Sequence, residues 1–561
     1  MTSRSTVLLL SVWLATTSGP GLGAQATKVP VTAPSIRAAA ILNHVKVLAS
    51  DQYEGRFPGT KGEQLSISYI ADQFKKAGLK PGNTDGTYFQ KVPVVGITPD
   101  PNTALTFTKG STTQTLKFKD DVVAWSKRVQ RTVSLDKSDV VFVGYGVQAP
   151  EFNWDDYKGV DLTGKTVIVL VGDPPVPDPA DPSKLDPKTF GGRAMTYYGR
   201  WTYKYETGAE QKAAAVLIVH ETEPAAYPFS VVQSKVTEQF DLVTPDKNMS
   251  RVAIEGWITL DQTKKLCAMA GQDFDALKKL AVTRAFKPVP FGVTASMTLT
   301  NTIRTIDSHN VAGKLEGSDP TLKDEYVIFT SHWDHYGIGP EIDGDKIYNG
   351  ALDNATGVGG LIELARAYSA LPTPPKRSLL FLSVTAEEQG LVGSDYYARN
   401  PIYPLAKTLG VINMDSLNIY GKTRDLVVVG LGNSDLDDYA RDAAAEQGRV
   451  VRPDPSPEKG GYFRSDHFPF AKQGVPAINA GGGDDYVGRP AGWGQQVEAE
   501  YTAKHYHKPS DEIRPDWDLT GAVQDLQIYF VMGYRVAQAD KFPDWKPGNP
   551  FKAKRDTMLG R

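Results

Sequence analysis

The sequence predicts a mixed α/β fold, with a largely parallel central sheet flanked by helices and an inserted, mostly β domain. Two observations lead to this fold class. Beyond residue 300, short apolar segments alternate with amphipathic segments at helical spacing, and strands that alternate with helices build parallel sheets. Between residues 133 and 290 most segments are strand-like instead, so this stretch is expected to fold as an insert.

Length and composition describe an ordinary globular protein. At 561 residues the chain is too long for one compact core, and two or three domains are expected. It is 40% hydrophobic and 23% charged, with a formal net charge of -3. Such a small net charge produces no strong field, so we expect no nucleic-acid partner and no binding to an anionic membrane. The oligomeric state is not indicated.

The first 26 residues have the features of a signal peptide. Arg4 supplies a positive charge, residues 7–15 form an apolar run, and Ala24-Gln25-Ala26 offers small residues for cleavage. The apolar run is shorter than the roughly 20 residues that a membrane-spanning helix requires. We therefore expect a secreted or periplasmic protein, with no membrane association after cleavage of residues 1–26. Cys267 is the only cysteine, which excludes an internal disulfide.

Residues 35–132 are expected to form the N-terminal part of the α/β domain. Apolar residues recur at helical spacing over 35–48 and 62–77, which predicts two helices. A loop over 51–62, rich in glycine and proline, separates them. Short β-prone runs follow from residue 92.

The stretch 133–290 is assigned to the inserted domain. Its Pro- and Asp-rich segment 173–187 is too long for a tight connection, and the pattern over 259–280 predicts helices. The apolar runs that predict strands are residues 140–147, 166–171, 213–219 and 252–258.

Residues 300–545 are assigned to the principal α/β domain. Its predicted strands are residues 310–315, 326–331, 378–385, 408–414, 426–429 and 475–479. Its predicted helices are residues 355–370, a segment from 394, 435–447 and 519–537. Ligands bind beyond the carboxyl ends of the strands in open α/β sheets, so residues that follow these strands are candidate site residues.

Acidic and histidine side chains follow three of these strands and occupy two nearby loops. They are His332, Asp334, Asp353, Glu387, Glu388, Asp415 and His507. With Asp334 and one of the two glutamates set aside for supporting roles, two imidazoles and three carboxylates without a thiolate remain, and these suit zinc, with cobalt and manganese as alternatives. A pair of such ions activates water and polarises a substrate carbonyl.

Two of these side chains suit supporting roles. Asp334, two residues after His332, is placed to orient that imidazole. In the Glu387-Glu388 pair, alternating side-chain directions let one carboxylate coordinate metal while the other moves a proton.

Five motifs occur in the order of a known family. They are His332-x-Asp334, Asp353-Asn354-Ala355, Glu387-Glu388, Asn413-Met414-Asp415 and Tyr506-His507. The series resembles the M28 family of di-zinc metallopeptidases, the aminopeptidase and glutamate carboxypeptidase group, over about residues 300–540. Residues 35–93 resemble the N-terminal lead of that family, and 133–290 resembles the protease-associated (PA) domain often inserted in it. The resemblance implies a zinc exopeptidase fold, with 300–545 as the catalytic peptidase domain.

The resemblance also implies a role for each matching position. The implied ligands are His332 and Asp415 on one zinc ion, Glu388 and His507 on the other, and Asp353 between the two. Glu387 would be the general base, and Tyr506 would steady the tetrahedral oxyanion. The implied cofactor is Zn²⁺, two per chain, and the implied partners are peptide substrates. An exported aminopeptidase that releases N-terminal amino acids is the first expectation.

Other functions stay open from the sequence. A carboxypeptidase or dipeptidase of the same family would use the same metals, and a glutaminyl cyclase-like acyltransferase would bind a single zinc ion. A non-catalytic, receptor-like binding protein is the alternative from another class. A cation near the site would favour a carboxylate-terminated substrate, and Arg464 is one candidate.

Three neighbouring features are expected to play no direct part in chemistry. His335 is expected to lie outside the ligand set, because the family pattern uses His332. The run Ser465-Asp466-His467 contains the residue types of a serine-hydrolase triad, but adjacent residues cannot adopt its geometry. Asp511 is expected to steady the loop that carries His507.

Overall fold

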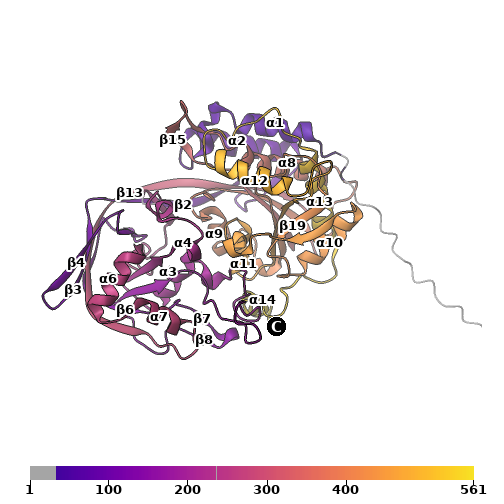
Figure 1. The fold of residues 1–561 in the computed structure, drawn as a ribbon. Coiled ribbons are helices and arrows are strands. Elements are labelled where there is room, and N and C mark those ends of the chain that lie inside the picture. Colours follow the sequence, from indigo (N-terminus) through magenta and orange to yellow (C-terminus); the bar gives the residue numbers. More distant parts are fainter. Residues whose placement is uncertain (1–32, 34, 235–236) are drawn as a thin grey trace, which may run out of the picture.

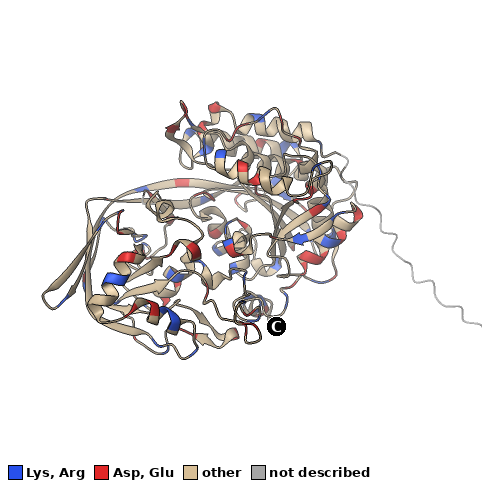
Figure 2. Cartoon of the chain, in the orientation of Figure 1, with Lys and Arg blue, Asp and Glu red and all other residues tan. Residues whose placement is uncertain are grey.

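The structure, a computed structural model, describes residues 33, 35–234 and 237–561. The predicted signal peptide, residues 1–26, lies outside the described residues. No helix in the described part is long and apolar enough to cross a membrane. Basic and acidic residues are interspersed along the visible elements (Figure 2), as the small net charge suggests.

The first of two large sheets forms the centre of the α/β domain. In spatial order its strands are β11 (Gln239–Leu242), β2 (Phe89–Pro99), β13 (Val289–Leu315), β17 (Ser378–Val384), β14 (Tyr326–His332), β18 (Thr408–Asn413), β21 (Ala477–Gly482), β19 (Asp425–Val429) and β20 (Val450–Pro453). β17, β14, β18 and β21 are parallel, whereas β13 pairs antiparallel with β17. The short β1 (Lys80–Pro81) pairs with the end of β13. The predicted mixed sheet with a parallel centre is confirmed.

Helices cover both faces of this sheet. Phe329 of β14 joins the core on one face and Ile328 the core on the other, because successive strand side chains point to opposite faces. The first face carries α1 (Ala38–Leu48), α2 (Lys61–Lys76), α8 (Gly357–Ser369), α10 (Leu436–Glu446) and α13 (Thr520–Gln538), with α12 (Trp493–Lys504) beside them. The second carries α9 (Val392–Arg399), α11 (His467–Lys472) and α14 (Lys552–Leu559). Burial on both faces explains why the central strands read as continuous apolar runs.

The second sheet is built on the other half of β13, which arches between the two sheets (Figure 1). Its order is β4 (Thr112–Lys117), β3 (Ala104–Lys109), β13, β6 (Thr132–Phe142), β9 (Thr166–Leu170), β10 (Ala215–His220), β12 (Ile254–Thr259) and β5 (Val122–Trp125). The helices packed on it are α3 (Trp201–Glu210), α4 (Thr222–Ala225), α5 (Phe229–Ser234), α6 (Leu260–Ala270) and α7 (Phe274–Ala281). The sheet takes strands from both sides of the stretch 133–290, and the domain boundaries stay a prediction.

Two short hairpins complete the described strands. β15 (Gly337–Ile342) pairs with β16 (Asp345–Tyr348), and β7 (Gln148–Ala149) pairs with β8 (Trp154–Asp155). The first hairpin begins five residues after His332 and leads into the turn before α8. It therefore separates His332 from Asp353 along the chain, although the fold brings both residues to the same site.

Candidate metal centre

Three adjacent parallel strands bring candidate ligands to one edge of the first sheet. His332 is the last residue of β14, and β14 has β17 and β18 as its neighbours. Glu387 and Glu388 lie in the loop after β17, and Asp415 lies just beyond β18. Because parallel strands end at the same edge, these four side chains come together although 83 residues separate His332 from Asp415.

Asp353 and His507 reach this edge from outside the sheet. Asp353 lies in the turn before α8, where the backbone N–H groups of Leu352 and Asp353 donate to the Asp511 carboxylate at 3.1 and 3.0 Å. His507 lies just after α12, and its Nδ1 is 3.1 Å from the hydroxyl of Tyr336. Asp511 therefore supports the turn of Asp353, and its own backbone N–H donates to the Lys508 carbonyl in the loop of His507 at 3.1 Å.

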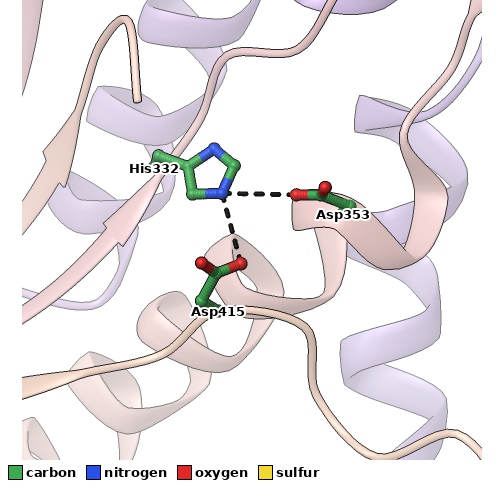
Figure 3. Close-up of side chains that lie close together, drawn as sticks. All are labelled: His332, Asp353 and Asp415. Carbon is green, nitrogen blue, oxygen red and sulfur yellow. Dashed lines mark hydrogen bonds and ion pairs between the residues drawn. The ribbon is translucent and has the colours of Figure 1, made fainter. Parts of the chain in front are cut away.

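The carboxylate of Asp353 lies between two groups of side chains. His332 Nε2 is 3.3 Å from Asp353 Oδ1 and 3.3 Å from Asp415 Oδ1 (Figure 3). His507 Nε2 is 3.3 Å from Asp353 Oδ2 and 3.1 Å from Glu388 Oε2. Each oxygen of Asp353 thus faces a different imidazole and its companion carboxylate. This is the arrangement required of a carboxylate that bridges two cations.

His335 lies inside this cluster, although its sequence position suggested otherwise. Its imidazole is fully buried, with Nδ1 2.6 Å from Glu388 Oε1. The candidate ligand atoms of His335, Asp353 and Glu388 lie within 4.8 Å of one another. The sequence carries no signal for this contact, because it depends on the pairing of β14 with β17.

The residues present fit a pair of divalent metal ions. Four buried ligand atoms make no hydrogen bond: both ring nitrogens of His335, Glu388 Oε1 and His507 Nε2. All but His335 Nε2 lie within ion-pair distance of another ligand atom but lack the geometry of a hydrogen bond. Buried polar atoms are nearly always hydrogen-bonded in folded proteins, so these atoms point to a bound cation. Imidazole and carboxylate donors without a thiolate are the donor set for zinc, cobalt or manganese.

Opposite charges within the cluster shift the pKa values of its members. Burial would lower the pKa of His332, but the carboxylates of Glu387 and Asp415 raise it well above its ordinary value. Burial would raise the pKa of Asp353, but the imidazoles of His332 and His507 that face its two oxygens hold it well below its usual range. Glu387 differs, because burial raises its pKa well above the ordinary value despite the opposing charge of His332. Glu387 therefore holds a proton readily.

Asp334 supports the glutamate loop as well as His332. Its carboxylate accepts hydrogen bonds from the backbone N–H groups of Glu387 at 3.0 Å and Glu388 at 3.3 Å. Its backbone carbonyl lies 3.2 Å from Nδ1 of His332, and its Oδ1 lies 3.9 Å from the same nitrogen. Burial raises the pKa of Asp334 to about 8. One residue thus couples the ends of β14 and β17.

Arg56, which the sequence analysis did not single out, ties together two segments behind the cluster. It is 1% exposed. Its guanidinium donates to the carbonyl oxygens of Leu48 (2.8 Å), Trp333 (2.9 Å), Asn349 (2.6 Å) and Gly350 (2.8 Å). Trp333 directly follows His332, and Asn349 and Gly350 lie shortly before Asp353. A single arginine in a glycine-containing loop forms no pattern that reveals such burial.

A cavity of about 280 Å³ opens beside the cluster and is lined by Asp353, Glu387 and Asp415. Tyr506 and Arg464 also line it. The ring of Tyr506 stacks on His507 with centroids 3.7 Å apart and is 44% exposed. The predicted oxyanion contact of Tyr506 stays a prediction.

The run Ser465-Asp466-His467 does not form a triad. Ser465 Oγ donates to Asp415 Oδ2 at 2.7 Å, and Asp466 accepts from Ser394 Oγ at 2.6 Å. Neither ring nitrogen of His467 makes a hydrogen bond. Ser465 instead positions Asp415, a role that only the folded sheet reveals.

Comparisons with known proteins point to one family. Residues 310–531 match the model of Peptidase family M28. Leupeptin-inactivating enzyme 1 of Streptomyces exfoliatus is 29% identical over 230 residues, which cover 38% of this chain and 46% of that protein. Aminopeptidase YwaD of Bacillus subtilis is 29% identical over 192 residues, which cover 34% of this chain and 36% of that protein. The matches thus span less than half the length of each of these relatives.

Solved structures of similar proteins were also found. An aminopeptidase from Aneurinibacillus sp. strain AM-1 has 20% identity and a TM-score of 0.49, covering 92% of this chain and 96% of that one. BSAP, a zinc aminopeptidase from Bacillus subtilis, has 18% identity and a TM-score of 0.40, covering 89% and 95%. The family match includes all five expected ligands, from His332 to His507. Residues 310–531 of this protein are therefore a domain of peptidase family M28.

Proposed function

We propose that this protein is a zinc-dependent exopeptidase, an aminopeptidase that removes N-terminal residues from peptides. The observation that carries the proposal is the position of Asp353, whose two oxygens face His332 on one side and His507 on the other. A binding protein gains nothing from five potential metal ligands gathered beside a cavity that two of them, Asp353 and Asp415, line, whereas a hydrolase with two metal ions requires them.

In this proposal His332, Asp415 and Asp353 would hold one ion, and Glu388, His507 and Asp353 would hold the other. Bound zinc would supply Lewis-acid polarisation of the scissile carbonyl and of the attacking water. The remaining chemistry belongs to the protein. The protein must above all supply a side chain that carries a proton during the reaction.

Glu387 suits that proton transfer. Its Oε2 lies 4.0 Å from His332 Nε2, its carboxylate lines the cavity, and burial raises its pKa. It would accept the proton of the attacking water and pass it to the leaving amine. Asp334 would hold Glu387 in place through the backbone N–H, and Tyr506 at the cavity wall would steady the oxyanion.

An N-terminal specificity is supported by the size of the cavity and by the name of one relative. Its volume of about 280 Å³ lies near the lower end of the roughly 300–1,000 Å³ typical of ligand pockets, which suits the end of a peptide. Among the relatives, YwaD is named an aminopeptidase and others are named probable zinc metalloproteases.

Two further parts of the proposal rest on the sequence. Residues 1–26 would direct export to a secreted or periplasmic location, and residues 133–290 would form a PA-like insert between 35–132 and the catalytic residues 300–545. The second sheet supports an insert of some kind, since β13 is the strand that it shares with the sheet that carries the ligands.

A metal count combined with a substrate panel tests the proposal. The purified chain should contain two zinc ions, cleave leucine p-nitroanilide, lose activity with a chelator and regain it when zinc is returned. One zinc ion per chain together with cyclisation of N-terminal glutamine would favour the cyclase alternative. Folded protein that binds no zinc and cleaves no aminoacyl or carboxyl-terminal substrate would instead support the receptor-like alternative.

A further inference from the structure

Arg464 is a cation in the wall of the proposed substrate cavity. It lies directly before Ser465, which holds Asp415, and it lines the same cavity as Asp353 and Glu387. Its side chain is exposed. Within residues 33, 35–234 and 237–561 its guanidinium forms no ion pair with any carboxylate. The charge is therefore available to a ligand.

A second arginine approaches from the other sheet. Arg200 precedes α3, and a Cβ placed on Gly460 would lie 3.5 Å from Arg200 Cδ and 2.6 Å from the sulfur of Met195. The segment is fixed there by the backbone hydrogen bond from Met195 to Pro457 at 3.1 Å. An ion pair between Arg193 and Glu458 at 3.0 Å adds to this connection.

The two guanidinium groups repel each other without a compensating carboxylate. Burial and, to a smaller extent, the positive charge of Arg464 together lower the pKa of Arg200 to about 10, while Tyr227 and Tyr197 oppose the shift. Arg200 Nε is buried and makes no hydrogen bond. Folding alone does not favour two adjacent cations of this kind, so an anionic ligand is the natural partner.

The other cavity residues agree with a polar ligand. Val429 and Tyr506 are the apolar or aromatic side chains of the lining, while Ser416 and Asn479 add polar groups. When the metal-site carboxylates neutralise bound cations, their attraction for Arg464 falls. Arginine can then grip a carboxylate with two parallel hydrogen bonds.

We infer that Arg464, with Arg200 behind it, recognises a carboxylate of the substrate, so that this peptidase selects peptide ends that carry a negative charge. This inference rests on the proposed function and narrows its substrate class. The carboxylate has two sources: the side chain of an N-terminal aspartate or glutamate, or the free carboxyl terminus of a dipeptide.

Two matched substrate pairs separate these sources. The first pair is glutamyl and glutaminyl p-nitroanilide, and the second is leucyl-alanine and leucyl-alanine amide. We expect wild-type kcat/KM to favour the charged member of one pair by about 10- to 100-fold, the range of a charge-assisted hydrogen bond. A preference in the first pair identifies the side chain, and a preference in the second identifies the carboxyl terminus.

Variants of Arg464 and Arg200 show whether these residues cause the preference for charged substrates. In Arg464→Met the ratio between charged and neutral members should fall toward one, mainly through KM. Arg464→Lys should keep part of the ratio because it keeps the charge, and Arg200→Met should reduce it. Arg441→Met, at an exposed arginine on α10 paired with Asp438, is the matched control and should keep the wild-type ratio.

The outcomes distinguish this inference from the proposed function. Cleavage of leucine p-nitroanilide without a charge preference in either pair overturns the inference alone. An unchanged ratio in Arg464→Met also overturns it, provided that zinc content and melting temperature match the wild type. A wild-type protein that cleaves none of these substrates overturns the proposed function and the inference with it.

Discussion

Replacing Arg56 by methionine should destabilise the peptidase domain and weaken metal binding together. The guanidinium is buried and donates to four carbonyl oxygens. Methionine fills much of the space but donates no hydrogen bond, so four buried acceptors lose their partner. At about 1 kcal/mol for each acceptor, the loss is about 4 kcal/mol. That is a large part of the roughly 5–15 kcal/mol by which folded domains are stable.

The effect on metal binding follows from where the carbonyls lie. Trp333 follows His332 directly, and Gly350 lies at the start of the turn that carries Asp353. The backbone of Arg56 has φ of 53°, a left-handed conformation that persists only when contacts hold it. Removal of groups that support metal ligands lowers affinity by about 10- to 100-fold, and we expect a decrease of this size.

Thermal unfolding and zinc competition with a chelator, measured well below the melting temperature, separate stability from affinity. Arg555→Met is the matched control. Arg555 is also buried and donates to the carbonyl oxygens of Leu405 and Thr408 at 3.3 and 2.8 Å. Thr408 begins β18, at the end opposite Asp415, so this variant should lose stability and keep its zinc affinity. Wild-type zinc affinity in Arg56→Met, or equal weakening in both variants, would refute the reasoning.

Three further predictions concern the cluster and its surroundings. Glu387→Gln should retain two zinc ions and the wild-type melting temperature while kcat falls by about 10²- to 10⁴-fold; normal turnover would exclude Glu387 as the proton carrier. Asp353→Asn should lose metal as well as activity, because the bridge loses its charge, and full zinc occupancy by elemental analysis would contradict bridging. Burial lowers the pKa of His467 to about 3, whereas the unfolded value is about 6.5, so the unfolded chain takes up the proton first. Stability should therefore fall as pH decreases from about 6.5 toward 3, by about 2 kcal/mol at pH 5, and His467→Gln should remove this part of the acid sensitivity in urea unfolding curves at pH 7 and 5; an unchanged dependence would show that other groups cause it.

Most strands of the first sheet could be predicted from the sequence, because each strand is marked by a local run of apolar residues. Buried parallel strands are continuous apolar runs, and the predicted runs around 326–331, 378–385 and 408–414 correspond to β14, β17 and β18. α12 was not predicted, because its residues Trp493–Lys504 show no apolar stripe, with Gly494 and Tyr501 as its buried residues. The continuity of β13 through both sheets also escaped prediction. Its long run of alternating residues does not reveal where one sheet ends and the next begins.

For the candidate metal centre too, local sequence identified the residues, and the tertiary structure decided their contacts. The sequence alone identified His332, Asp353, Glu388, Asp415 and His507 as a group, because their positions relative to strand ends follow from local pattern and from the order of family motifs. Only the tertiary structure decided how they face one another, that His335 touches Glu388, and that Arg56 holds the loops from behind. Only the tertiary structure brings Arg200, the residue before α3, to the segment of Gly460 that leads to Arg464. Local periodicity sets which side chains stand at the end of each element, whereas contacts between distant segments arise when strands pair and helices pack, and no local pattern records that pairing.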